Sequence, residues 1–160
     1  MSEKGIKSLG IEPSLFLSRD GIIKNRNVIT GNLKDLSNQN KKFEEKKYSI
    51  SLPKIKRNKK MNFYHWSLKD PLIVNEYGIP EPIKKKIVYP NILLVPLVAF
   101  DKNLNRIGYG GGFYDRYIKK ISKIKKIFTI GLAYSFQQVK KIPVNNYDIK
   151  LDYIITEKNN

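Results

Sequence analysis

The sequence predicts an α/β protein: a three-layer α/β/α sandwich around a mostly parallel, Rossmann-like sheet. Three observations lead to this class. Residues 92–95 are continuously apolar, as in a strand buried on both faces. A glycine-rich loop follows them, then a segment with apolar residues at helical spacing, and residues 127–133 resemble a second buried strand. Strand, loop, helix and strand in this order are typical of a βαβ unit, whose strands run parallel.

Residues 1–46 are expected to form a divergent or shortened N-terminal segment, and residues 47–160 the body of a single domain. The first segment mixes glycine and proline with polar residues. Within it, only residues 28–29 suggest a short strand, and Asn32 can cap a helix over residues 33–43.

The elements of the body follow from alternation and from turn residues. Residues 48–52 alternate apolar and polar side chains and predict a strand that ends at Pro53, followed by a basic loop over 54–60. The remaining expectations are an aromatic strand at 61–66, a glycine- and proline-containing loop at 75–82, a helix at 113–121, a helical turn at 136–139 and a last strand at 151–156.

Composition excludes several classes of protein. The chain has 160 residues, the size of one domain, and contains no cysteine and one histidine. Disulfides, thiolate nucleophiles and histidine-cluster metal sites are therefore ruled out. The sequence contains no run of about 18 apolar residues, so a membrane span is not expected. The first residues also lack the apolar core of a secretory signal. We expect a cytoplasmic monomer that does not bind membranes.

The formal net charge of +17 has two readings. A strongly basic chain attracts polyanions such as RNA, nucleotides or anionic lipid. However, lysine, isoleucine and asparagine are frequent together, as AT-rich codons produce, and the lysines are spread along the chain. The charge alone therefore favours compositional bias over a nucleic-acid partner.

The most informative motif is the glycine loop, residues 108–112, which contains four glycines in five positions. Glycines allow a backbone to approach an anion closely, and a helix that begins directly afterwards adds a favourable dipole. Arg106 and Arg116 flank the loop and can neutralise phosphate. Asp115 can hold Mg²⁺ together with phosphates, or can instead stabilise the first helical turn. The loop matches neither Walker A nor the dinucleotide fingerprint, and a flexible turn without a ligand remains an alternative.

The longer stretches, residues 95–101 and 106–116, resemble the signature of the 5-formyltetrahydrofolate cyclo-ligase (methenyltetrahydrofolate synthetase) family. Shorter matches keep the same order from about Lys47 to Glu157: residues 51–53, 61–63, 77–79, 81–82, 131–133 and 151–157.

The resemblance implies an ATP-dependent reaction. Family enzymes use ATP to phosphorylate the formyl oxygen of 5-formyltetrahydrofolate. N10 then attacks the activated carbon, and 5,10-methenyltetrahydrofolate, ADP and phosphate result. ATP as co-substrate and Mg²⁺ are the implied cofactors. Such chemistry depends mainly on positioning and charge neutralisation.

The resemblance also implies roles for single residues. The expected catalytic residues are Arg106, Tyr114 and Asp115. ATP is expected to contact Arg106, Gly108, Tyr109, Gly110, Gly111, Gly112, Phe113 and Tyr114. The folate is expected to contact Met61, Phe63, Tyr77, Tyr109, Phe113 and Tyr114. The expected Mg²⁺ ligands are Asp115 and Asp148. Met61 and Phe63 can equally be ordinary core residues, and Asp148 can be a turn residue.

The N-terminal segment departs from the family pattern, because no clear equivalent exists for the Lys-x-x-x-Arg helix that reaches the phosphates. Tyr147 also replaces the usual histidine before Asp148. One lost charge-assisted contact costs roughly 1.5–3 kcal/mol, so a degenerate homologue that binds without efficient turnover competes with an active enzyme. A third alternative is an RNA-binding module built on the basic clusters at 54–60 and 119–126, with aromatic residues beside the first cluster.

Overall fold

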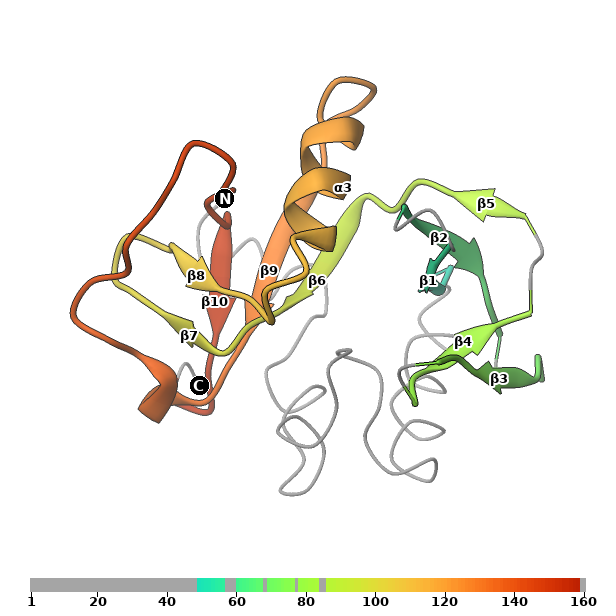
Figure 1. Cartoon of the computed structure of the whole chain (residues 1–160), viewed down its shortest axis with the longest axis horizontal. Coiled ribbons are helices and arrows are strands. Elements are labelled where there is room, and N and C mark those ends of the chain that lie inside the picture. The colour runs from blue at the N-terminus through green and yellow to red at the C-terminus, as the bar shows by residue number, and fades with distance from the viewer. Residues whose placement is uncertain (1–48, 57–59, 68, 77, 84–85, 159–160) are drawn as a thin grey trace.

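The computed structural model describes residues 49–56, 60–67, 69–76, 78–83 and 86–158 (Figure 1). The elements are β1 (Ser51–Ile55), β2 (Met61–His65), β3 (Leu72–Val74), β4 (Pro80–Pro82), β5 (Ile87–Val88), β6 (Ile92–Pro96), β7 (Ala99–Phe100), β8 (Arg106–Ile107), α3 (Phe113–Ile121), β9 (Phe128–Leu132), the 3₁₀ turn η2 (Ser135–Gln137) and β10 (Tyr153–Ile155). The strand expected at 28–29, the helix expected at 33–43 and Tyr77 lie outside the described residues.

A parallel three-stranded sheet, ordered β10-β9-β6, forms the C-terminal part of the molecule. Its strands confirm those predicted at 92–95, 127–133 and 151–156. Because successive side chains of a strand point to opposite faces, β6 contributes to both sides of the sheet. Leu93 and Val95 belong to the larger core cluster, while Ile92 and Leu94 pack against the smaller one. The apolar run is therefore explained by two covered faces.

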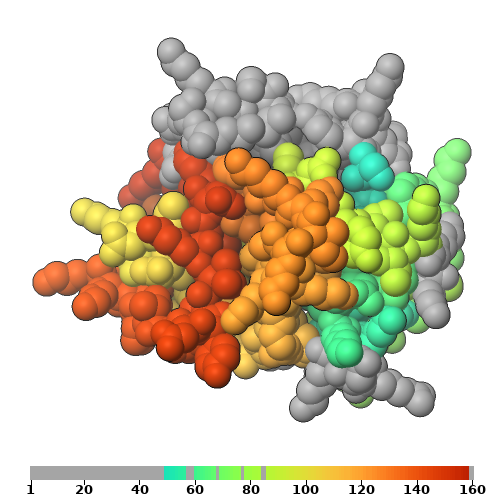
Figure 2. Space-filling view, turned by 90° about the horizontal axis from the view of Figure 1, so that it is seen from above, coloured from blue at the N-terminus to red at the C-terminus, as the bar shows by residue number. Residues whose placement is uncertain are grey.

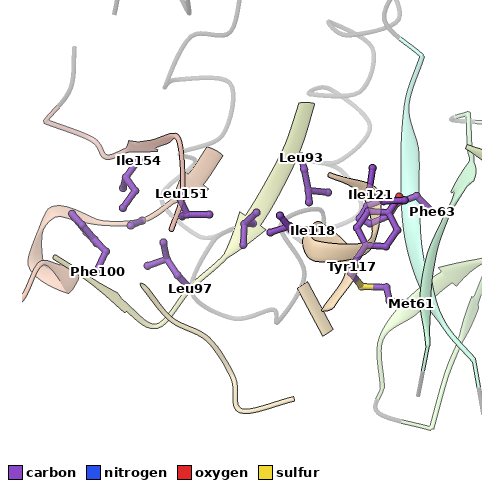
Figure 3. Close-up of a cluster of buried hydrophobic side chains, with 12 residues drawn as sticks. Met61, Phe63, Leu93, Leu97, Phe100, Tyr117, Ile118, Ile121, Leu151 and Ile154 are labelled. Atoms are coloured by element: carbon purple, nitrogen blue, oxygen red, sulfur yellow. The ribbon is translucent and has the colours of Figure 1, made fainter. Parts of the chain in front are cut away.

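The helix α3 lies between the parallel sheet and the N-terminal strands (Figures 1 and 2). It occupies the predicted residues and buries Tyr117, Ile118 and Ile121. In Figure 3, Ile118 lies near Leu93 of β6, whereas Tyr117 lies toward Met61 and Phe63 of β2. The helix thus connects the two halves of the core.

Strands β1 to β5, with the described residues between them, form what we call the N-terminal lobe. It contains the antiparallel sheet β1-β2-β5 and the hairpin β3-β4. The expected strand end at Pro53 was wrong, because β1 continues to Ile55 and Pro53 pairs with Phe63. β1 is an edge strand, where a residue without an N–H is tolerated. Residues 80–82, expected in a loop, form β4, which is likewise at an edge.

Aromatic packing joins the lobe to α3. The Phe63 and Tyr117 rings lie 4.9 Å apart between centroids and are tilted by 49°, an arrangement typical of favourable aromatic pairs. In the described part of the chain, no backbone hydrogen bond joins the sheet of the lobe to the parallel sheet. Among the described residues, side-chain packing therefore connects the two sheets.

The hairpin β7-β8, which the sequence did not predict, positions Arg106. Its turn is organised by Asp101, which is 1% exposed. Asp101 Oδ1 accepts from the amides of Asn103 and Asn105, at 2.9 and 3.0 Å. Its Oδ2 accepts from Asn105 Nδ2 at 3.0 Å and from the Ile142 amide at 3.2 Å. One carboxylate thus shapes the turn and fastens the segment that leads to Asp148.

The parallel sheet with its helix confirms the α/β class. Most strand pairs among the described residues are antiparallel, and α3 is the one α-helix in the described part of the chain. The three-layer, Rossmann-like arrangement therefore stays a prediction. Across the described ranges, no helix has the length and apolar character needed to cross a bilayer.

Candidate functional site

A cleft of about 840 Å³ separates the N-terminal lobe from the glycine loop and the start of α3. One wall comes from β1, β2 and β4 with Ile79, and the other from residues 106–116, Lys119 and residues 143–148. The lining residues are Pro53, Ile55, Met61, Ile79, Glu81, Pro96, Arg106, Ile107, Gly108, Tyr109, Gly110, Gly111, Gly112, Phe113, Tyr114, Asp115, Arg116, Lys119, Pro143, Asn145, Tyr147 and Asp148. Most residues predicted for the site therefore share one cavity.

Two glycines of the loop adopt left-handed backbone conformations. The φ angle is 85° at Gly110 and 59° at Gly112, the residue that caps the N-terminus of α3. Such angles are unfavourable for residues with a Cβ. The turn that leads into α3 therefore depends on glycine at these positions.

The other loop glycines leave room for side chains of the same loop. A Cβ built on Gly108 would lie 2.8 Å from Arg106 Nη1, and one built on Gly111 would lie 2.6 Å from the Phe113 ring. A Cβ built on Gly112 would likewise lie 2.8 Å from Arg116 Nη1. The glycine pattern thus allows two guanidinium groups and one ring to fold against the loop.

Asp115 lies in the first turn of α3 and is held by two donors. Arg106 Nη2 donates to Asp115 Oδ1 at 2.8 Å, and the Ile149 amide donates to the same oxygen at 3.2 Å. The side chain of Arg106 is 5% exposed and that of Asp115 is 17% exposed. None of the described residues donates a hydrogen bond to Asp115 Oδ2.

Asp148 lies at the end of an exposed turn next to Ile149, the residue whose amide binds Asp115. Its Oδ2 accepts from the Asn145 amide at 2.9 Å, so Asp148 is a turn residue as well as part of the cleft wall. Asp115 and Asp148 each keep one carboxylate oxygen without a protein donor in this part of the structure. Two such oxygens suit Mg²⁺, which takes one or two carboxylates plus substrate phosphates. Within the described ranges, no group of three potential ligands forms an all-protein metal cage.

Three aromatic side chains of the loop line the cleft: Tyr109, Phe113 and Tyr114. Tyr109 is 50% exposed, and the Arg116 guanidinium lies 5.2 Å from the centre of the Phe113 ring. Burial raises the pKa of Tyr114, although the nearby Arg106 cation partly opposes the shift. The shift keeps the Tyr114 hydroxyl protonated, so it can donate a hydrogen bond.

Of the residues Met61, Phe63 and Tyr77, which were predicted to contact the pterin, only Met61 is seen to line the cleft in the described part of the chain. Met61 is 7% exposed, lines the cleft and also belongs to the core. Phe63 lies two residues along the same face of β2 and packs on Tyr117, outside the cleft lining. Tyr77 lies outside the described residues.

The sequence analysis did not assign Lys119, Glu81 or Tyr147 to the site, although all three line the cleft. Lys119 follows Asp115 by four residues and so shares its face of α3, a spacing visible in the sequence. Its Nζ lies 5.8 Å from the centre of the exposed Tyr147 ring. Glu81 is 4% exposed, and its Oε1 accepts from the Ile55 amide at 3.0 Å and Asn75 Nδ2 at 2.8 Å. No local pattern signals the contact of Glu81 with Ile55, which lies 26 residues earlier in the chain.

A model of the 5-formyltetrahydrofolate cyclo-ligase family matches residues 34–157. The chain belongs to this family. The match includes the whole cleft wall from Pro53 to Asp148 and confirms the resemblance carried by residues 95–116. It begins before Lys47, inside the segment expected to diverge.

Individual cyclo-ligases agree with the family match. The chain is 44% identical over 86 residues to the 5-formyltetrahydrofolate cyclo-ligase of Haemophilus influenzae, covering 51% of this chain and 46% of that protein. It is 36% identical over 99 residues to the Escherichia coli K12 enzyme of the same name, covering 59% and 54%. The chain thus spans about half the length of these relatives.

Solved structures share the fold. The 5,10-methenyltetrahydrofolate synthetase of Aquifex aeolicus is 36% identical, with a TM-score of 0.61, over 74% of this chain and 61% of that one. The 5,10-methenyltetrahydrofolate synthetase of Mycoplasma pneumoniae is 25% identical, with a TM-score of 0.56, over 73% and 61%. Both likenesses support an α/β cyclo-ligase fold for the described part of the chain.

Proposed function

We propose that this protein is an ATP- and Mg²⁺-dependent 5-formyltetrahydrofolate cyclo-ligase. The observation that carries the proposal is the cleft, in which the family's glycine loop, Asp115 and Asp148 form one wall opposite Met61. The family match and the relatives named above support the same activity. The three-layer sandwich, the cytoplasmic location, the monomeric state and a body that begins near Lys47 belong to the same proposal.

In this reaction the formyl oxygen of 5-formyltetrahydrofolate attacks the γ-phosphorus of ATP, and ADP leaves. N10 of the folate then attacks the activated carbon, the formyl oxygen departs on inorganic phosphate, and N10 gives up its proton. The product is 5,10-methenyltetrahydrofolate. The protein's task is to align two substrates and neutralise phosphate charge.

The glycine loop and the N-terminus of α3 are suited to the triphosphate, because main-chain N–H groups at a helix start favour anions. Arg116 and Lys119 line the cleft and add positive charge. Asp115 and Asp148 would hold Mg²⁺, which supplies charge neutralisation when it is bound with the nucleotide. Met61 and the aromatic residues Tyr109, Phe113 and Tyr114 would contact the planar folate.

The decisive experiment follows the absorbance of the methenyl product with ATP, Mg²⁺ and 5-formyltetrahydrofolate. We expect turnover by the wild type and a loss of about 100-fold or more in Asp115→Ala, because a metal ligand is removed. Glu76→Ala is the matched control, since Glu76 is an exposed carboxylate outside the cleft. Melting temperatures of all three proteins test folding.

Absence of product from a folded wild type would contradict the enzymatic proposal. Calorimetric binding of nucleotide or folate in that case would identify a homologue that binds without efficient turnover. This alternative is motivated by the altered N-terminal segment.

A further inference from the structure

Glu81 is a buried carboxylate in the wall of the cleft that faces the glycine loop. Its side chain is 5% exposed, and it lines the cleft together with Pro53, Ile55, Met61 and Ile79. These four neighbours are apolar, and a carboxylate buried among apolar side chains is costly unless donors compensate its charge. The partners of its two oxygens therefore indicate what Glu81 does.

The two oxygens of Glu81 have different surroundings. Oε1 accepts from the Ile55 amide at 3.0 Å and from Asn75 Nδ2 at 2.8 Å. None of the described residues donates a hydrogen bond to Oε2. The Lys54 ammonium lies 3.9 Å from Oε2 and donates instead to the Pro82 carbonyl, at 3.3 Å. Oε1 thus fastens the side chain to β1 and to the β3-β4 turn, while Oε2 has a positive charge nearby but no donor.

Support of the fold does not require this charge. A glutamine at position 81 can accept both hydrogen bonds of Oε1 through its amide oxygen, and a neutral amide costs less to bury than a carboxylate. What the carboxylate adds is Oε2, a second acceptor on a residue of the cleft wall. Such an acceptor suits a ligand that presents N–H donors.

The folate substrate carries such donors. In 5-formyltetrahydrofolate the pyrimidine ring of the pterin bears a 2-amino group next to N3–H. This end of the bicyclic ring lies opposite the ring that carries the formyl group. Because the formyl oxygen must face the nucleotide at the glycine loop, the 2-amino end is directed toward the opposite wall. Glu81 of β4 belongs to that wall.

We propose that Glu81 is a specificity-determining residue for the pterin, with Oε2 accepting hydrogen bonds from the 2-amino group and N3–H. The inference rests on the proposed function, since it concerns the folate bound in the same cleft. Lys54 balances the charge of Glu81 without occupying Oε2, and Met61 and Ile79 supply apolar contacts for the ring. A site built to hydrogen-bond an N–H group discriminates strongly against an analogue that lacks it.

The variant Glu81→Gln removes the charge and keeps an oxygen for the Ile55 and Asn75 donors. Its amide also places an N–H donor where the donors of the substrate would bind. Calorimetry without nucleotide measures the Kd for 5-formyltetrahydrofolate, and initial rates give both KM values. We expect the Kd and KM for the folate to rise about 10-fold or more, while the KM for ATP and the melting temperature change little. Glu76→Gln, which alters an exposed carboxylate outside the cleft, should match the wild type.

A modified ligand distinguishes recognition of the pterin from a structural role of Glu81. The 2-desamino-2-methyl analogue of 5-formyltetrahydrofolate lacks the amino donor and retains the rest of the molecule. We expect the wild type to bind the analogue about 10-fold or more weakly than 5-formyltetrahydrofolate, and Glu81→Gln to bind the two within about 3-fold of each other. A structural role would weaken both ligands equally in the variant and leave the ratio of their Kd values unchanged.

A ratio that is the same in both proteins, or a variant that binds the folate as tightly as the wild type, would overturn the inference and leave the proposed function standing. If the variant does not fold, the wild type alone still tests the inference, because equal Kd values for the two ligands would overturn it. A folded wild type that binds neither ligand would contradict the proposed function itself, and with it the inference.

Discussion

Two buried polar side chains, Asp101 and Tyr117, affect the stability of this fold in opposite directions. Asp101 and Tyr117 are both almost fully buried. The Asp101 carboxylate accepts four hydrogen bonds, whereas the Tyr117 hydroxyl has no hydrogen-bond partner among the described residues. A buried acceptor with full pairing stabilises a fold, and an unpaired hydroxyl weakens it. These two residues give opposite predictions for substitution.

Replacing Asp101 by Asn should lower the free energy of unfolding at pH 7 by about 2–4 kcal/mol. The neutral amide cannot accept from all four donors, and it loses the charge that strengthens these bonds. Chemical denaturation of both proteins measures the difference. Asn103→Ala is a suitable control, because it retains the backbone amide that donates to Asp101 and should change stability little.

The same carboxylate predicts how stability depends on pH. Burial alone would raise the pKa of Asp101, but hydrogen bonds from Asn105, Ile142 and Asn103 outweigh it and hold the pKa below its usual value. Its contribution to stability is therefore complete above the unfolded pKa of about 3.9 and is lost as the pH falls further. Acid titrations of unfolding should show a steeper loss in the wild type than in Asp101→Asn. Parallel curves would contradict this assignment.

Replacing Tyr117 by Phe should leave the free energy of unfolding unchanged or raise it by up to about 1 kcal/mol. The substitution removes a buried hydroxyl and retains the ring that packs on Phe63. Tyr117→Leu is the comparison that removes the ring, and it should destabilise the protein. A clear loss of stability in Tyr117→Phe would mean that the hydroxyl has a partner.

At the scale of elements, β9 shows how closely the parallel sheet is covered. Gly131 lies in this strand, and a Cβ built there would come within 2.7 Å of Leu151 Cδ1, 2.8 Å of Leu97 Cδ2 and 3.1 Å of Ile154 Cγ1. Leu97, Leu151 and Ile154 can therefore pack this closely against β9 only because Gly131 has no side chain.

Gly131→Ala should destabilise the protein by about 1–3 kcal/mol through overpacking. Thermal and denaturant unfolding measure the effect. The double variant Gly131→Ala/Leu97→Ala tests the cause, because it makes space beside the new methyl group. Its loss should be smaller than the sum of the two single losses, whereas simple additivity would argue against a steric origin.

Elements with a local signal were predictable, and those fixed by distant partners were not. The apolar runs of β6 and β9 and the helical spacing of α3 are properties of short segments, and the structure confirms them. The extension of β1 past Pro53 and the edge strand that contains Pro80 were missed, because edge position depends on which strand pairs with which. The glycine loop was predictable as part of the site. The pairing of Arg106 with Asp115, nine residues later, follows from the β7-β8 hairpin and is not visible in spacing.

At the scale of the whole molecule, the formal net charge of +17 should assist the capture of anionic substrates. If the proposed function is correct, raising NaCl from about 50 to about 500 mM should increase the KM for ATP several-fold, because salt screens long-range attraction. Initial rates at saturating folate measure this effect, and circular dichroism at each salt concentration controls for folding. An unchanged KM would show that charges within the cleft dominate.

The packing between Phe63 and Tyr117 has a consequence for the cleft. Ladder hydrogen bonds have a fixed register, but apolar surfaces can slide over one another by small amounts at low cost. Among the described residues, side-chain packing and not a strand ladder connects the two walls, and such packing tolerates small adjustments. A substrate pair that touches both walls would act as a non-covalent cross-link between the halves, so that occupancy itself would tighten the protein around the reacting atoms.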